Sequence, residues 1–216
     1  MMSEILAQSL TLLSFIFVLT LVHAAGSVLA CLACRIRVDG VSIFYGKTLT
    51  TIKTPLCPVS IGCLPCGGSV SFDIEDFDRR SLFVRWTVIF SGVLALLVVA
   101  GVCLRVDVAM SAFGSGFSQI ILGAIAPFER GAPLVAGFFD QVNESLLVGG
   151  GLFAAKFAAF NLLPIPPLTG GRLLTEIPRN HLKGAVWMWC NVLGAVVSFM
   201  IMLCWLAALV NCWRHP

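Results

Sequence analysis

Few side chains in this sequence could do chemistry, and most of them lie in apolar surroundings. His23 is the one histidine in the apolar stretch 5–34, and Lys156 is the one charge in the apolar stretch 146–163. An ionisable group inside a membrane-spanning helix marks a functional site or is held by polar groups of the bundle. His23 therefore binds a metal with help from elsewhere or is hydrogen-bonded within the bundle. Lys156 pairs with polar groups such as Asn161, snorkels to an interface, or faces a wet groove.

Several helix-breaking residues follow the second of these stretches. Pro164, Pro166 and Pro167 prevent the helix from continuing, and Gly170 and Gly171 allow backbone conformations denied to other residues. Lipid cannot satisfy the exposed backbone groups, so such a break is tolerated only where it lines a cavity walled by protein. We expect the break to be functional.

Cysteines in the first polar segment form a third candidate. Cys57, Cys63 and Cys66 have the spacing C-x5-C-x2-C. A structural zinc site has four ligands, and no nearby residue obviously supplies the fourth. Reduced thiols are the alternative, and they are usual in the cytosol.

The composition shows what kind of elements must position these residues. Hydrophobic residues make up 58% of the chain and charged residues 12%, and the mean hydropathy is +0.97. A soluble domain has about 25% charged residues, so this chain cannot form a water-facing surface. The net charge of +3 is spread along the chain, which excludes a basic nucleic-acid surface.

We therefore predict an all-α polytopic membrane protein that forms a single membrane domain, 1–216. A helix needs about 20 apolar residues to cross the bilayer. Four uncharged or nearly uncharged stretches meet or approach this length, and we expect spans at 5–34, 84–104, 146–163 and 184–212. The first is read as a retained helix and not as a signal peptide.

Lysine and arginine predict the orientation, because they collect in cytoplasmic loops. Nine of them lie in 35–80 and 164–184, against three in 105–145 and the two tails. Both termini are then outside.

The cytoplasmic loop 35–80 alternates apolar and polar residues around Gly40 and Gly46, which predicts a small β-hairpin or sheet against the membrane. In the outer segment 105–145, the stretch 108–128 is rich in Gly and Ser and is expected to form an interfacial or re-entrant helix.

Several motifs resemble those of the site-2 protease family of intramembrane zinc metalloproteases. Residues 160–172, FNLLPIPPLTGGR, are similar to the family's N-x-x-P-x-P-x-L-D-G-G signature, and residues 23–27, HAAGS, lie where its H-E-x-x-H motif belongs. Residues 41–47 and 65–70 resemble the family's F-S-I-G-F-G-K and P-L-G-G-Y-V stretches, and Ser91-Gly92 falls in its second span. The resemblance covers about residues 10–175 and is closest to the bacterial branch that cleaves anti-sigma factors. The outer segment is too short for the PDZ domain found in many relatives.

The resemblance also shows what this chain lacks. The family's two histidines and its later aspartate hold zinc, and its glutamate is the general base. The corresponding positions here are His23, Ala24, Ser27 and Thr169. One imidazole with two neutral hydroxyls is a poor zinc site, so we expect no catalytic residue to be intact, no metal site and no cofactor.

These observations predict a pseudoprotease that binds, scaffolds or regulates a transmembrane protein partner. Asn161, Pro164, Pro166, Pro167, Gly170 and Gly171 would line the partner groove, as the family's loop does. Two alternatives stay open: an active intramembrane protease with variant ligands, which would bind zinc, and a repurposed subunit of a membrane transport or secretion complex. We expect the protein to lie in a lipid bilayer, the bacterial inner membrane. We expect it to bind no nucleic acid.

Overall fold

The computed structural model describes residues 2–176 and 185–214. Gly184, where we expect the last span to begin, lies outside the described residues. By its internal contacts the chain divides into two compact units, 1–96 and 97–216. That the two form a single membrane domain, 1–216, stays a prediction. Each unit is described by itself.

The first unit joins a long helix to a small sheet. Its elements are α1 (Met2–Ala33), β1 (Val38–Lys53), β2 (Pro58–Phe72), α2 (Ile74–Asp78) and most of α3 (Leu82–Cys103). Helix α1 packs against both strands. It also approaches α3 closely at Gly26, where a Cβ atom would lie 2.7 Å from the Cβ of Ala95 and 2.8 Å from the carbonyl oxygen of Ser91. Gly26 therefore leaves the space that Ala95 and the backbone of α3 fill at this contact.

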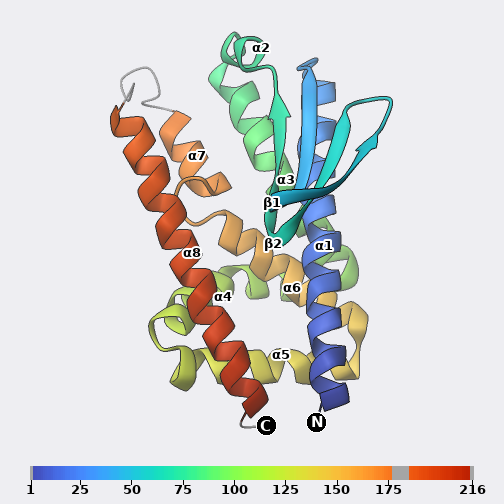
Figure 1. Cartoon of the computed structure of the whole chain (residues 1–216), viewed down its shortest axis with the longest axis vertical. Helices are drawn as coiled ribbons and strands as arrows, with labels where there is room; N and C mark the ends of the chain where they lie inside the picture. The colour runs from blue at the N-terminus through green and yellow to red at the C-terminus, as the bar shows by residue number, and fades with distance from the viewer. Residues whose placement is uncertain (1, 177–184, 215–216) are drawn as a thin grey trace. The chain divides into compact units, whose positions relative to one another are not determined.

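The expected small sheet is confirmed, and its two strands are strongly bent (Figure 1). Residues 41–43 each have two partners, one in 59–61 and one in 68–70. The bends use Gly46 and Gly67, whose φ angles of 83° and 104° are unfavourable for residues with a Cβ. The alternation of the sequence predicted strands, but not this doubled pairing.

The described residues of the second unit form helices and the loops that join them. Its elements are α4 (Val106–Ile125), the π-helical turn η1 (Pro127–Gly131), α5 (Ala132–Glu144), α6 (Leu146–Asn161), α7 (Thr169–Glu176) and α8 (Ala185–Arg214). Helix α4 packs on α6 and α8, and α5 packs on the same two helices (Figure 1). The indole Nε1 of Trp205 donates to the carbonyl of Ile120 at 3.1 Å and ties α8 to α4.

The polytopic helical class is confirmed, but the membrane-length helices are not the four expected. Within the described residues these are α1, α3, α4 and α8 from Val186 onward. Helix α4 occupies the segment expected to be interfacial or re-entrant, and it runs for 20 residues. Helix α6, expected as the span 146–163, has only 16 residues. Its length of about 24 Å is less than the roughly 30 Å of a bilayer core.

Hydrogen bonds explain why the serine-rich segment forms a long helix. The hydroxyl of Ser115 donates to the carbonyl of Ala112 at 3.2 Å, and that of Ser118 donates to the carbonyl of Ser115 at 3.0 Å. Both hydroxyls are thus satisfied by their own helix, as lipid requires. Helix α6 stops at Asn161, three residues before Pro164, as the proline break predicts. That the outer segment stays outside, with α6 as the third crossing, remains a prediction.

Candidate functional site

The imidazole of His23 lies against bare backbone of the neighbouring helix. A Cβ atom at Gly92 of α3 would lie 2.7 Å from both Cε1 and Nε2 of His23. Both residues belong to the first unit, and Gly92 is buried. The glycine therefore leaves the space that the imidazole fills.

The next motif positions on α1 carry no metal-binding group. Ala24 is buried, with 5% of its surface exposed, and has no ionisable atom. Ser27 lies one turn after His23, and its hydroxyl donates to the backbone carbonyl of His23 at 3.2 Å. This side chain thus completes its own helix. The first unit supplies one imidazole at the motif, without a base beside it.

The loop between α6 and α7 is tightly packed against the start of α7. Thr169 is the first residue of α7 and is 7% exposed. A Cβ atom at Gly170 would overlap the carbonyl of Leu162, and one at Gly171 would overlap the backbone of Pro166. We expected these glycines to provide unusual backbone angles, but both are helical and neither has a positive φ. They provide space for the returning chain instead.

The loop also packs closely against α8. The carbonyl of Pro166 occupies the position that a Cβ atom of Gly194 in α8 would take. Leu163 is buried between helices of the second unit, together with Ile120 and Ala159. Pro164 and Pro167 are exposed. The loop therefore exposes two prolines, while Leu163 and Pro166 pack against other helices of the second unit.

Asn161 has a more local contact than we expected for a groove residue. Its Nδ2 donates to the carbonyl of Phe157 at 2.8 Å, which fills the last turn of α6. The amide oxygen remains available as an acceptor.

These residues do not fit a zinc ion. Catalytic zinc takes three protein ligands of imidazole, carboxylate or thiolate type. The motif positions offer the imidazole of His23, a helix-bonded serine hydroxyl, a threonine hydroxyl and Ala24. Among the residues that the structure describes, no three His, Cys, Asp or Glu side chains come together as a metal site.

The three loop cysteines differ in their surroundings. Cys57 is buried, Cys63 is exposed and Cys66 is half-buried. Burial raises the pKa of the Cys66 thiol, which keeps it protonated at neutral pH and lowers its ability to bind metal. Whether the cluster binds a metal in the cell remains a prediction, and reduced thiols fit these surroundings.

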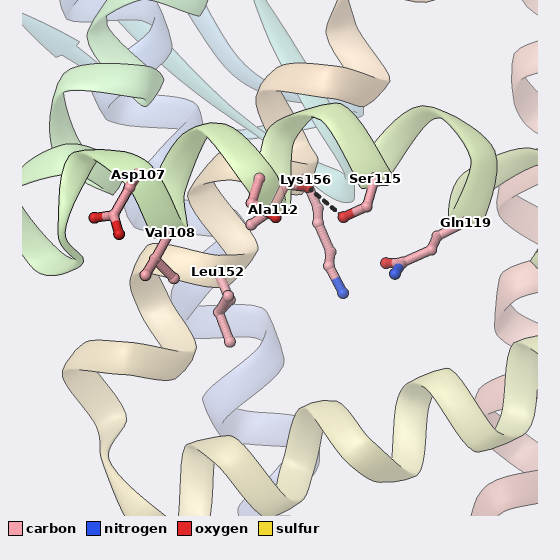
Figure 2. A pocket seen from close by; sticks show the side chains of 8 residues that line it. Asp107, Val108, Ala112, Ser115, Gln119, Leu152 and Lys156 are labelled. Carbon is pink, nitrogen blue, oxygen red and sulfur yellow. Dashed lines mark hydrogen bonds between the residues drawn. The ribbon is translucent and has the colours of Figure 1, made fainter.

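Lys156 lies in a polar pocket, as in the alternative that it faces a wet groove, but its polar neighbours on α4 were not predicted. The pocket has a volume of about 500 Å³ and lies between α4 and α6 (Figure 2). Its polar lining residues are Asp107, Ser111, Ser115, Gln119 and Lys156. The four residues of α4 recur every fourth position, which places them on one helical face. That spacing could have predicted a polar face on a helix here. The glycine and serine content of the segment argued against a long helix, so the spacing was not used.

Taken together, the fold and the site define a helical integral membrane protein. It has the proline-broken helix of the intramembrane metalloproteases and keeps one of the two histidines of their zinc motif. The chain belongs to peptidase family M50, the site-2 protease family, whose sequence profile matches residues 11–204. Members of this family are typically zinc metalloproteases. None of the curated proteins compared with the chain matches it.

Proposed function

We propose that this protein is a catalytically inactive member of its family that binds a transmembrane partner and scaffolds or regulates it. The observation that carries the proposal is the donor set at the motif. Ala24 replaces the general base, and the hydroxyl of Ser27 is already bonded to the carbonyl of His23. Loss of a general base alone lowers a rate by about 10²- to 10⁴-fold. No hydrolytic step is assigned to these residues.

The loop 161–171 is the partner site in this proposal. Its backbone is held by Gly170, Gly171 and Gly194, contacts that need no metal. The exposed Pro164 and Pro167 have no amide hydrogen and a fixed φ angle, so they present a rigid surface to a bound segment. Such a loop can receive an unwound helix without cleaving it. The membrane is taken to be a bacterial inner membrane, with both termini outside.

Zinc analysis of the purified protein tests the inactive assignment. We expect well under one zinc per chain, and stability that is unaffected by chelator in both the parent and His23→Ala. The matched gain-of-function variant combines Ala24→Glu, Ser27→His and Thr169→Asp. Residues 23 and 27 share a helical face, so the variant should raise zinc occupancy if the fold brings the carboxylate at position 169 to them.

Occupancy is measured by elemental analysis after purification in mild detergent, and each variant must first be shown to be monodisperse. Stoichiometric zinc in the parent that His23→Ala abolishes would refute the inactive assignment and favour an active protease with variant ligands.

A further inference from the structure

The polar pocket between α4 and α6 holds a cation that forms no ion pair with the residues the structure describes. Lys156 is half-buried, and its ammonium group and the amide of Gln119 extend into the same open space (Figure 2). Within the part of the chain that the structure describes, no carboxylate forms an ion pair with Lys156. Asp107, at the far end of the pocket, pairs with Arg105 at 3.3 Å instead.

The pocket also has an unused acceptor. The Oε1 atom of Gln119 is buried and accepts no hydrogen bond from the described residues. An uncompensated buried polar atom costs about 1–3 kcal/mol, and an unpaired charge costs more. A lysine and an unsatisfied amide on facing helices therefore form a site that is complete only with a ligand.

The position of Lys156 restricts what that ligand can be. Lys156 lies ten residues after Leu146 and five residues before Asn161, the two ends of α6, which is about 15 Å and about 7.5 Å along the helix axis. Its ammonium group extends sideways into the pocket between α4 and α6 and not past either end of the helix (Figure 2). The carboxylate side chain of a helix that packs along α4 and α6 can reach it there.

The wall of the pocket suits a helix as well. The middle of the lining on α4 consists of Ser111, Ala112 and Ser115, with Val108 before them, and Gly116 lies directly against Ala159 of α6. Small side chains of this kind permit close approach of another helix in a membrane. Five of the eight lining residues are polar, which disfavours an acyl chain.

From these observations we infer that the α4–α6 pocket binds a transmembrane helix that carries a single aspartate or glutamate near its middle. The inference rests on the proposed function only in taking a transmembrane helix as the occupant. The site is separate from the loop 161–171. Lys156 pairs with the carboxylate, and Gln119 accepts from a backbone or side-chain donor beside it.

The test uses the purified full-length protein in phosphatidylcholine vesicles at pH 8 and synthetic Leu/Ala transmembrane peptides with a central Asp, Asn or Leu. Association is measured by fluorescence energy transfer. We expect the parent to bind the Asp peptide about tenfold more tightly than the Leu peptide, which corresponds to one charge-assisted hydrogen bond. The Asn peptide should gain only about threefold, the size of an interhelical hydrogen bond.

Three variants make the test specific. Lys156→Met, which keeps the length of the side chain without its charge, should remove the preference for Asp over Leu. Lys156→Arg should retain it. Pro166→Ala with Pro167→Ala should also retain it, so that a failure of the loop proposal is distinguished from a failure of this one.

Equal binding of the Asp and Leu peptides by the parent would overturn the inference. So would an undiminished Asp preference in Lys156→Met. If 20% phosphatidylglycerol in the vesicles abolished the preference, an anionic lipid head group would be the occupant and the helix assignment would be wrong.

Discussion

At the scale of single residues, the most informative contact is that between an imidazole and a glycine. His23 and Gly92 lie on different helices of the first unit, and the ring fills the space beside the glycine. The sequence predicted that His23 is the remaining ligand-type residue and that Gly92 belongs to the family's second-span motif. It could not predict that the two touch, because the contact depends on how α1 and α3 cross.

This contact leads to a prediction about coupled substitutions. Gly92→Ala adds a Cβ atom 2.7 Å from the His23 ring, so we expect it to destabilise the protein by about 1–3 kcal/mol through overpacking. In the His23→Ala background, the same change should cost much less. Thermal unfolding in mild detergent measures both effects. An equal loss of stability in both backgrounds would contradict the packing described above.

At the scale of elements, sequence patterns located the helix break well and the helix lengths less well. Proline chemistry places the end of α6 before Pro164, and the structure ends that helix at Asn161. From the glycine and serine content of the 108–128 segment we expected an interfacial or re-entrant helix and not one long enough to cross the bilayer. Serine hydroxyls bonded to the preceding turn hide their polarity, and hydropathy alone does not show this.

The attachment of the loop to α8 was not visible in the sequence. A glycine inside an apolar helix is unfavourable by about 1 kcal/mol relative to alanine, which signals a reason for Gly194 but not its partner. The partner is the backbone of Pro166, 28 positions earlier. Only tertiary structure brings such positions together.

Two glycine substitutions test this attachment. Gly194→Ala should destabilise the protein by about 1–3 kcal/mol, because the new methyl group would overlap the carbonyl of Pro166. Gly114→Ala is the matched control, since nothing lies within 4 Å of a Cβ at that position of α4. The control should be neutral or slightly stabilising. Melting temperatures compared in one detergent check the pair, and similar melting temperatures for the two variants would argue against a fastened loop.

At the scale of the whole molecule, the open question is which helices cross the bilayer. Composition alone establishes an integral membrane protein, and family membership agrees with it. The distribution of lysine and arginine predicts that 35–80 lies in the cytoplasm and 105–145 outside. Helix α4 is nevertheless long enough to cross, and a crossing there would move Arg130 to the cytoplasmic side.

Cysteine accessibility distinguishes these topologies. In a cysteine-depleted background, a cysteine introduced near Lys47 should be protected from an impermeant thiol reagent, and one near Arg130 should be labelled from outside, because of the charge bias. Labelling is quantified in intact cells and again after permeabilisation. Protection of both positions would show that α4 crosses the membrane, and labelling near Lys47 would overturn the orientation.

The contact of Pro166 with Gly194 also has a consequence for how the protein is made. The loop is synthesised before α8, so its backing surface does not exist until the last helix has left the ribosome and inserted. Any partner that needs the finished loop can therefore be captured only after translation is complete. A chain that ends before Ala185 would include every position that matches the family's motifs and still lack the helix on which the loop packs.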